Sequence, residues 1–516
     1  METASEGWAR PGGDPAFAAV LTMRATPGDV PGAVLDFLEP GWGVEPLSSP
    51  SADQRRLLVR VDDEASLRRL LQLAGRRRGQ VLGCADRLWA MSVGGRIQVR
   101  PRTPVSTAED VVLVHGSGVA RLAARIAAEP AVADVVTGRL NRVAVVSDGT
   151  AVLGLGDVGP LAALSVMEAK SALFAQLAGI DAVPVCLSAT SAEELATVVL
   201  ALAPMFGGIN LDGVAAPRCI EVRRRLQDQL DIPVLHDPEH ATVVVVLAAL
   251  RNALRVVGKQ LRGARIAVLG AGVVGTALTR LLLRSGAGDV LVWTPGGVLC
   301  AAAGGPLPAH EVWLAEHTNP RRVRGGLEQA LHGADAVLGL SRSAALSREL
   351  LAAMAPGPIV FTLAESQSKI RQPHLAGLAA VLATRRPNAA NQLTDAVVLP
   401  GLLRGAINAR APRISTAMLL AAADVVAGLV GEDRLSATVC CRTCWTLGSC
   451  RRWRRRSPRW RRPGADPGRT RTEGRFRMVQ PMARRRCDES AAVPARGRVV
   501  HDAGASGPDS GAGAAR

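Results

Sequence analysis

Strands and helices alternate regularly in the second half of the chain. Short apolar runs are separated by amphipathic stretches from residue 258 to residue 432. The predicted strands read RIAVLG, DVLVW, ADAVLGL, PIVFTLA and AAVLATRR, and a stretch of helical periodicity follows the first of them. Continuous apolar strands separated by helices are typical of a parallel sheet that is buried on both faces. The pattern therefore predicts an α/β domain with a Rossmann-like, doubly wound sheet over residues 258–432.

A different pattern occupies residues 16–92. The strand AFAAVLTMR precedes a helix near Pro31–Leu38, the strand RRLLVRVD precedes the helix EASLRRLLQLAG, and the strand QVLGCADRL follows. This β-α-β-β-α-β spacing predicts a ferredoxin-like α+β module. The module resembles an ACT domain, a regulatory unit that often binds amino acids or other small effectors. A module that only packs against the rest of the protein fits the same pattern.

The chain is long enough for about three domains. No segment is predicted to span a membrane, because the longest apolar candidate, Ile414–Val430, contains Asp424. The first residues lack the basic and apolar regions of a signal peptide, so a cytoplasmic location is expected. The expected segments are an ACT-like module (1–95), a second α/β block (96–257), the Rossmann-like domain (258–432) and a disordered tail (433–516).

The net charge of +17 comes mostly from the end of the chain. The segment from Val439 onward contains 19 Arg, no Lys and 6 acidic residues, so the preceding residues are close to neutral. Such a balance gives no reason to expect nucleic acid as a partner of the main body.

A glycine-rich loop follows the predicted strand RIAVLG and precedes a helix. Glycines at this spacing allow a tight turn and let the backbone approach a pyrophosphate at the helix N-terminus. An acid at the end of the next strand would bind the ribose hydroxyls, but that strand ends at Trp293-Thr294. The expected dinucleotide-binding residues are Gly270, Ala271, Gly272, Val273, Val274, Gly275 and Thr294.

A second glycine-rich loop, Gly154–Gly159, has the same spacing. Asp181 lies about 20 residues beyond it, where a ribose-binding acid would be expected. Spacing alone does not decide between the two loops.

Several long runs resemble the bacterial NAD-dependent malic enzymes over about residues 95–435. They are VSDGTAVLGLGDVGPLAALSVMEAKSALFAQLAGIDAVPVCL, FGGINLDGVAAPRCIEVRRRL, DIPVLHDPEHATVVVVLAALRNALRVVGK and LPGLLRGAINARA. The resemblance implies a malic-enzyme-type substrate domain that contains the earlier loop, and NAD or NADP on the later loop. It also implies a small malate- or pyruvate-like substrate and a homo-oligomer.

The resemblance assigns roles to individual side chains. Lys170 stands at the position of the family's general base, and Asp237 at that of the aspartate paired with it. His115 stands in the segment of the family's proton-donating tyrosine, and this chain contains no tyrosine. Glu365 and Asp395 occupy positions that normally help to hold malate, where an acid would repel a dicarboxylate.

This sequence lacks most of the acidic ligands of the metal site that the resemblance implies. A hard divalent cation such as Mg²⁺ or Mn²⁺ prefers several carboxylate oxygens. Of the three acidic ligands implied by the resemblance only Asp212 remains, and Gly213 and Pro238 stand at the other two positions. Metal binding is therefore expected to be weak, and Gly213→Asp together with Pro238→Asp is expected to restore it.

Two hypotheses follow from these substitutions. The chain is either a divergent malic enzyme, which would oxidise and decarboxylate malate to pyruvate with NAD(P), or a catalytically silent nucleotide- or effector-binding regulatory protein. Loss of the tyrosine together with two metal ligands favours little or no malate decarboxylation.

The cysteine- and arginine-rich tail, which begins near Val439, has three interpretations: a basic nucleic-acid arm, a zinc site or a frameshift product. Cys440, Cys441 and Cys444 have no second pair or histidine at zinc spacing. With GC-rich codons, the neighbouring reading frame encodes a proline-bearing stretch like the family's own C-terminal segment. A frameshift is therefore favoured, and the tail is predicted to be disordered.

Overall fold

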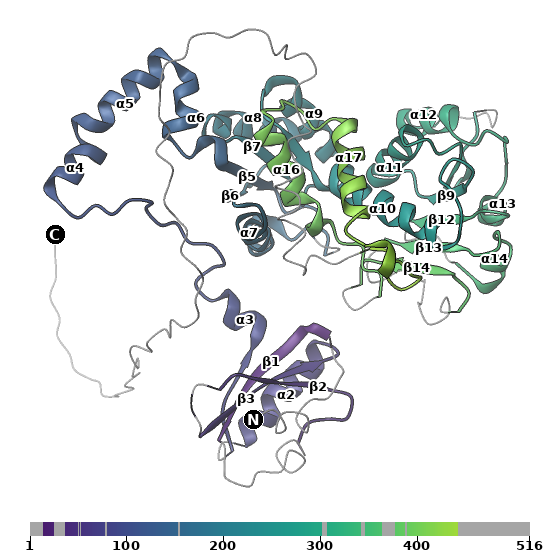
Figure 1. Cartoon of the computed structure of the whole chain (residues 1–516), viewed down its shortest axis with the longest axis horizontal. Helices are drawn as coiled ribbons and strands as arrows, with labels where there is room; N and C mark the ends of the chain where they lie inside the picture. Colours follow the sequence, from purple (N-terminus) through teal and green to yellow (C-terminus); the bar gives the residue numbers. More distant parts are fainter. Residues whose placement is uncertain are drawn as a thin grey trace, which may run out of the picture. The chain divides into compact units, whose positions relative to one another are not determined.

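The computed structural model describes residues 14–24, 37–49, 51, 53–77, 80–152, 155–301, 307–341, 346–363, 377–386 and 390–441. Within these residues the named strands form three sheets (Figure 1). The predictions for the tail beyond residue 441, and for Glu365, lie outside the described residues.

The first sheet is antiparallel and has the strand order β2-β3-β1-β4. Its region contains β1 (Asp14–Arg24), β2 (Gly43–Leu47), β3 (Gln54–Val61), α2 (Glu64–Arg76), β4 (Val81–Asp86) and α3 (Arg87–Ser92). Leu67 and Leu70 of α2 are buried in one core with Leu21 and Leu57 of the sheet. This strand order fits a ferredoxin-like fold. The predicted helix near Pro31–Leu38 lies largely outside the described residues, and effector binding stays a prediction.

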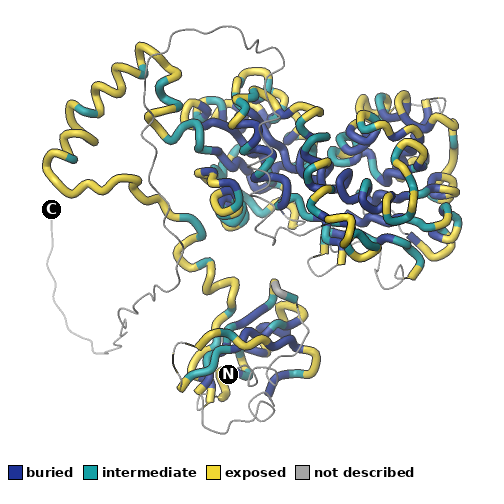
Figure 2. The backbone as a smooth tube through the Cα atoms, in the orientation of Figure 1, coloured by how far each residue is buried: buried dark blue, intermediate teal, exposed yellow. Residues whose placement is uncertain are grey.

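Exposed helices follow this module, as the yellow tube of α4 and α5 shows in Figure 2. The elements are α4 (Ala108–His115), α5 (Ser117–Ala128), η2 (Pro130–Val132), α6 (Ala133–Val136) and η3 (Arg139–Asn141). By length and composition alone, Ala108–Ala128 and Gly159–Ala178 could each cross a membrane. The first is divided at Gly116, between α4 and α5, and the second packs into the protein core through Met167 and Phe174.

The second sheet is parallel, with the strand order β6-β5-β7-β8. Its region contains β5 (Arg142–Ser147), α7 (Gly159–Ala178), β6 (Asp181–Cys186), α8 (Ala192–Leu202), η4 (Ala203–Met205), β7 (Gly208–Leu211), α9 (Arg218–Gln229), β8 (Val234–His236) and α10 (Asp237–Val256). Val143 and Val145 of β5 are fully buried in the core that also contains Met167 and Phe174 of α7. Because the strands are parallel, the residues that follow β5, β7 and β8 lie at one edge of the sheet.

The third sheet has the strand order β11-β10-β9-β12-β13-β14 and is parallel except for β11. Its region contains β9 (Arg265–Leu269), α11 (Val273–Arg284), β10 (Asp289–Thr294), β11 (Gly297–Val298), α12 (Ala309–His317), α13 (Leu327–Leu331), β12 (Ala336–Gly339), α14 (Arg348–Ala352), β13 (Ile359–Thr362) and β14 (Val381–Thr384). The predicted doubly wound sheet is confirmed. Strand order reverses at β9, which lies between β10 and β12, and ligands of such sheets bind at this point.

The chain then returns to the helices beside the second sheet. It forms η5 (Asp395–Val397), α16 (Leu399–Asn408), α17 (Thr416–Ala427) and η6 (Glu432–Arg434). Helix α16 packs on α7 and α10, and α17 packs on α10 and α11. These last helices therefore join the second and third sheets instead of belonging to the Rossmann-like domain alone.

The fold continues beyond residue 432. Cys440 is fully buried, its backbone N–H donates to Asn391 Oδ1 (2.7 Å), and its carbonyl accepts from Asn252 Nδ2 (3.0 Å). The expected start of a disordered tail at residue 433 is therefore wrong for residues 433–441, because their backbone satisfies buried asparagine side chains.

Candidate functional site

Three charged side chains meet at the carboxyl edge of the second sheet. Lys170 comes from the middle of α7, Asp212 directly follows β7, and Asp237 directly follows β8. The Lys170 ammonium forms ion pairs and hydrogen bonds with Oδ2 of both aspartates. We call Lys170, Asp212 and Asp237 the lysine cluster. The structure thus brings together three residues that the sequence singled out, whereas their catalytic roles stay predictions.

Burial and mutual charge set the protonation of the lysine cluster. Burial alone lowers the pKa of Lys170, but Asp212, Asp237 and Asp395 outweigh burial and hold this pKa above its ordinary value. Burial raises the pKa of Asp237 to about 7; Lys170 opposes this shift, and the other two carboxylates add to it. Burial also disfavours ionised Asp212, but Lys170 brings the pKa of Asp212 below its ordinary value. The surrounding carboxylates thus stabilise the positive charge of Lys170, which stays protonated. A general base must instead be unprotonated to accept a proton.

Asn210 supports the cluster and was missed in the sequence. It is fully buried in β7, and its Nδ2 donates to Asp237 Oδ1 (2.5 Å). Its Oδ1 is buried and has no hydrogen-bond partner in the part of the chain that the structure describes. The available signal was a lone amide inside the otherwise apolar strand GINL.

A divalent metal does not fit the residues present here. No group of three or more His, Cys, Asp or Glu side chains among the described residues could hold a metal ion. Lys170 engages both Asp212, the acidic ligand that remains, and the neighbouring Asp237. Gly213 has a φ of +67°, and a Cβ added to it would lie 2.5 Å from Ser147 Oγ. A side chain at residue 213 would therefore have to displace the Ser147 hydroxyl, and restoration of the metal site by the two substitutions stays a prediction that depends on this residue.

The remaining predicted site residues differ in their surroundings. His115 is exposed at the end of α4, and no hydrogen bond or ion pair joins it to the lysine cluster within the described residues. Asp395 influences Lys170 electrostatically, and its Oδ2 pairs with Arg385 (3.2 Å) and accepts from Thr242 Oγ1 (3.5 Å). Arg385 neutralises part of the repulsion that Asp395 was expected to exert on a dicarboxylate. The sequence had not indicated this arginine.

A histidine network lies beside the lysine cluster. His236 Nδ1 contacts Glu239 (2.7 Å), Arg223 pairs with the same carboxylate (2.6 Å), and the His236 backbone N–H donates to His240 Nδ1 (2.9 Å). Burial lowers the pKa of His240 to about 3. Burial alone would raise the pKa of Glu239, but His236 and Arg223 bring it to about 2. Both groups therefore favour the native state at neutral pH.

The later glycine-rich loop has the geometry of a dinucleotide cradle. Gly270 has a φ of +125° directly after β9. A Cβ on Gly275 would lie 1.9 Å from the Gly270 carbonyl oxygen, so only glycine allows this close approach. A Cβ on Gly272 would meet nothing within 4 Å. The backbone of Gly272 at the start of α11 therefore faces open space that could receive a pyrophosphate.

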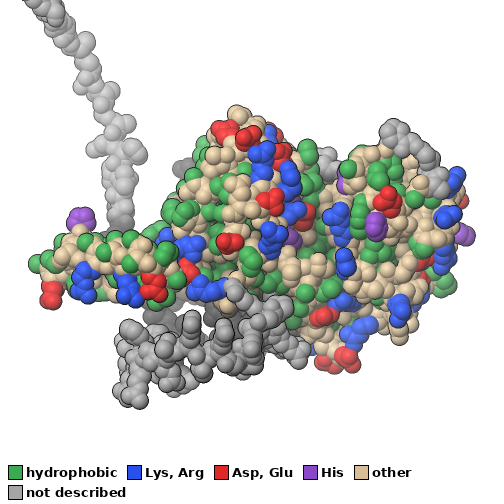
Figure 3. All heavy atoms as spheres, turned by 90° about the horizontal axis from the view of Figure 1, so that it is seen from above, with side chains coloured by type: hydrophobic (Ala, Val, Ile, Leu, Met, Phe, Trp, Pro, Cys, Tyr) green, Lys and Arg blue, Asp and Glu red, His purple; other side chains and the backbone are tan. Residues whose placement is uncertain are grey.

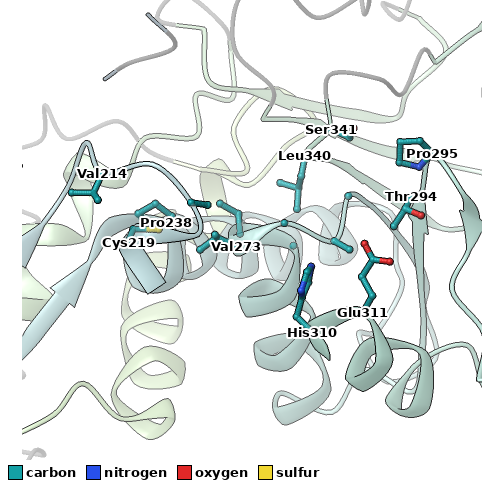
Figure 4. A pocket seen from close by; sticks show the side chains of 16 residues that line it. Val214, Cys219, Pro238, Val273, Thr294, Pro295, His310, Glu311, Leu340 and Ser341 are labelled. Carbon is teal, nitrogen blue, oxygen red and sulfur yellow. The ribbon is translucent and has the colours of Figure 1, made fainter. Parts of the chain in front are cut away.

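A cavity of about 560 Å³ lies over this loop (Figure 4). Val214, Cys219 and Pro238 lie on one side of the cavity, and Thr294 and Pro295 lie on the other. The loop Gly270–Gly275 also lines it. All seven residues predicted to bind the cofactor line it.

The earlier glycine-rich loop folds against its own chain instead. Gly149 O accepts from Val158 N (3.0 Å), and a Cβ on Gly149 would lie 2.2 Å from the Gly159 carbonyl. Gly154 lies outside the described residues. A Cβ on Gly156 or Gly159 would meet nothing within 4 Å, so open space alone does not separate the two loops. The cavity over Gly270–Gly275 favours the later loop.

Comparisons with known proteins identify the fold. A family model described as "Malic enzyme, N-terminal domain" matches residues 126–197. The chain is 40% identical to an NAD-dependent malic enzyme of Geobacillus stearothermophilus over 402 residues, which are 77% of this chain and 83% of the relative. It is 37% identical to an NADP-dependent malic enzyme of Halomonas elongata over 347 residues, which are 66% of this chain and 81% of the relative.

A solved structure gives the same result. The NAD-dependent malic enzyme of Thermotoga maritima has 35% sequence identity and a TM-score of 0.67, and the match covers 72% of this chain and 98% of that one. The resemblance predicted from the sequence is confirmed, and the chain belongs to the malic enzyme family.

Proposed function

We propose that this protein is a malic-enzyme-family oxidoreductase that binds NAD or NADP but decarboxylates malate slowly or not at all. The observation that carries the proposal is the closed lysine cluster: Lys170 pairs with Asp212, the one implied metal ligand that remains, and with the neighbouring Asp237. The relatives that the chain matches are NAD- and NADP-dependent malic enzymes, which supports the substrate class and the cofactor.

The reaction defines what the residues must do. Malate loses a hydride from C2 and a proton from its hydroxyl, the resulting β-keto acid loses CO₂, and the enolate is protonated at C3 to give pyruvate. A bound nicotinamide would accept the hydride. The lysine cluster must then take the hydroxyl proton, and a separate acid must supply the C3 proton.

The cluster is poorly suited to the first proton transfer. Lys170 is already protonated, and the carboxylates around it raise its pKa. Asp237, with a pKa of about 7, is the group there that can accept a proton at neutral pH. Asp237 is 4% exposed and bonded to Asn210 and Lys170, so it is positioned to hold Lys170 and lacks direct access to a substrate.

The second proton transfer also lacks an acid in place. His115 is the predicted donor, but it is exposed and unconnected to the cluster within the described residues. The homo-oligomer expected from the sequence stays a proposal. In such an oligomer, a second copy could bring its His115 to the lysine cluster.

The second candidate function is a silent regulatory protein that binds a nucleotide or an effector. The ferredoxin-like strand order of the first sheet favours it, because the ACT-like interpretation needs this topology. Nucleic acid is not proposed as a partner, since acidic and basic side chains are interspersed on the face shown in Figure 3.

Calorimetric titration of the full chain with NAD, NADP and Mn²⁺ tests the proposal. We expect one or both nucleotides to bind and Mn²⁺ to give no specific heat. Tight Mn²⁺ binding by the unaltered chain would contradict the proposal that the lysine cluster holds no metal. Failure of both nucleotides to bind would contradict the proposal that the loop Gly270–Gly275 binds a dinucleotide.

A further inference from the structure

The ribose end of the nucleotide cavity contains an acid that β10 does not supply. In Rossmann-like domains an Asp or Glu that follows the glycine-rich loop by about 20 residues bonds the ribose hydroxyls. Here β10 ends at Thr294, whose Oγ1 accepts from Gly296 N (3.3 Å) and donates to Gly297 O (3.5 Å). The hydroxyl of Thr294 is thus used to hold the turn between β10 and β11.

Glu311 takes part in the wall of the same cavity. It lies in the first turn of α12 and lines the cavity together with Thr294, Pro295 and His310. In Figure 4 its carboxylate points toward the side where Thr294 and Pro295 lie. Glu311 is partly exposed, and its carboxylate makes no hydrogen bond or ion pair with another described residue. It is therefore available to a ligand.

The described residues at this end of the cavity carry a negative charge. Among the described residues that line the cavity there is no Lys or Arg, and Glu311 is the only carboxylate. A carboxylate accepts hydrogen bonds from hydroxyl groups but repels a phosphate. Arg324 is an alternative residue for nucleotide recognition, because it lines an adjoining cavity that shares Pro295. An arginine in that region could receive a phosphate instead.

We propose that Glu311 accepts hydrogen bonds from the adenosine ribose hydroxyls of NAD and excludes the 2′-phosphate of NADP. The proposal rests on the proposed dinucleotide binding and adds a residue that determines cofactor specificity. A residue of α12, the helix after β11, thereby takes the ribose-binding role that an acid at the end of β10 would otherwise have.

Two dissociation constants measured by calorimetry test this assignment. We expect the unaltered full-length protein to bind NAD about tenfold or more tightly than NADP. Glu311→Gln keeps the size of the side chain and removes its charge, so it should bring the two constants to within about threefold by tightening NADP. Glu316→Gln is the matched control, because Glu316 is exposed on the same helix and does not line the cavity; it should leave the ratio unchanged.

Other outcomes separate this proposal from the function on which it rests. Equal affinity of the unaltered protein for both nucleotides, or an unchanged ratio in Glu311→Gln, would overturn the role of Glu311 and leave dinucleotide binding intact. A preference for NADP that Arg324→Ala abolishes would assign the specificity to Arg324 instead. If neither nucleotide binds, the proposed function fails, and the role of Glu311 fails with it.

Discussion

The glycine-rich loop and the lysine cluster both follow the carboxyl ends of parallel strands, but they differ in what fills them. The loop leaves open space over Gly272. The cluster is closed by its own ion pairs, which join Lys170 to Asp212 and Asp237. A ligand can enter the first site without breaking a protein contact, whereas a metal or substrate at the second must replace one.

The two sites also depend on different parts of the chain. Binding at the loop relies on backbone conformation and close approach, which Gly270 and Gly275 still provide. Chemistry at the cluster relies on side-chain donors, which Gly213 and Pro238 no longer offer. A fold can therefore keep a nucleotide site while it loses the groups that perform a reaction.

Removing the central cation should have the largest effect on stability. Lys170→Ala would leave Asp212 and Asp237 buried together without their ammonium partner. We expect the free energy of unfolding at neutral pH to fall by about 3–5 kcal/mol, measured by urea denaturation. Glu432→Gln is the control, because its pair with Arg255 is exposed, and it should change stability by less than about 1 kcal/mol. Unaltered stability of Lys170→Ala would show that the cluster is not closed as described.

A methyl group in the nucleotide loop should have the next largest effect. Gly275→Ala places a Cβ against the Gly270 carbonyl, so we expect a loss of roughly 1–3 kcal/mol in stability and loss of NAD binding. Gly263→Ala is the matched control, because nothing lies within 4 Å of its Cβ. Thermal unfolding and NAD titration of both variants provide the readouts, and normal NAD affinity in Gly275→Ala would rule out the cradle.

Acid should weaken the region of the lysine cluster. His240 and Glu239 have pKa values of about 3 and about 2, below those of the unfolded chain. Their contribution is therefore fully present above about pH 6.5 and is lost as the pH falls, first through His240 and below about pH 4.5 also through Glu239. Asp237 opposes this loss, because its raised pKa of about 7 makes the native state take up a proton as the pH falls from about 7 to about 4. We therefore expect little net change in the free energy of unfolding from these groups above about pH 4.5, and a fall on the order of 1 kcal/mol per pH unit below it.

The histidine can be tested separately. His240→Asn keeps an acceptor for the His236 N–H and removes the titrating ring. The opposing contribution of Asp237 is then uncompensated, so the free energy of unfolding should rise as the pH falls from about 6.5 to about 4.5. His317→Asn, at an exposed position of α12, should leave that dependence as it is. A pH dependence in His240→Asn that is the same as in the unaltered protein would show that His240 does not titrate as described.

Restoring metal affinity should need three changes. Gly213→Asp with Pro238→Asp supplies the missing carboxylates, but the new Cβ at residue 213 would meet Ser147 Oγ. We therefore expect measurable Mn²⁺ binding only when Ser147→Ala is added, even though this removes the hydrogen bond from Gly149 N. Calorimetry compares the double and triple variants, and equal Mn²⁺ affinity in both would show that Ser147 is no obstacle.

The sequence was most informative where function depends on local motifs. The loop Gly270–Gly275 and Lys170 were both found from short runs and their resemblance to a family. Asn210, Ser147 and Arg385 were not, because each contacts the cluster or a residue beside it through tertiary packing and has no distinctive spacing in the chain.

The end of the fold was also hard to locate from composition. The residues up to Cys441 share the unusual composition of the tail. Cys440 is nevertheless buried, and its backbone forms hydrogen bonds with the side chains of Asn252 and Asn391. Glu311 was missed for a related reason: the expected acid was sought at the end of β10, whereas this side chain arrives from α12.

Malate turnover by purified, unaltered protein tests the central claim most directly. The assay measures NADH and NADPH formation from malate in the presence of Mn²⁺, at nucleotide concentrations that the titration shows to be saturating. With Lys170 held as a cation and the metal positions lacking donors, we predict formation near background. Turnover above about one per second, the low end of ordinary enzymes, that is also abolished in Lys170→Ala would contradict the account.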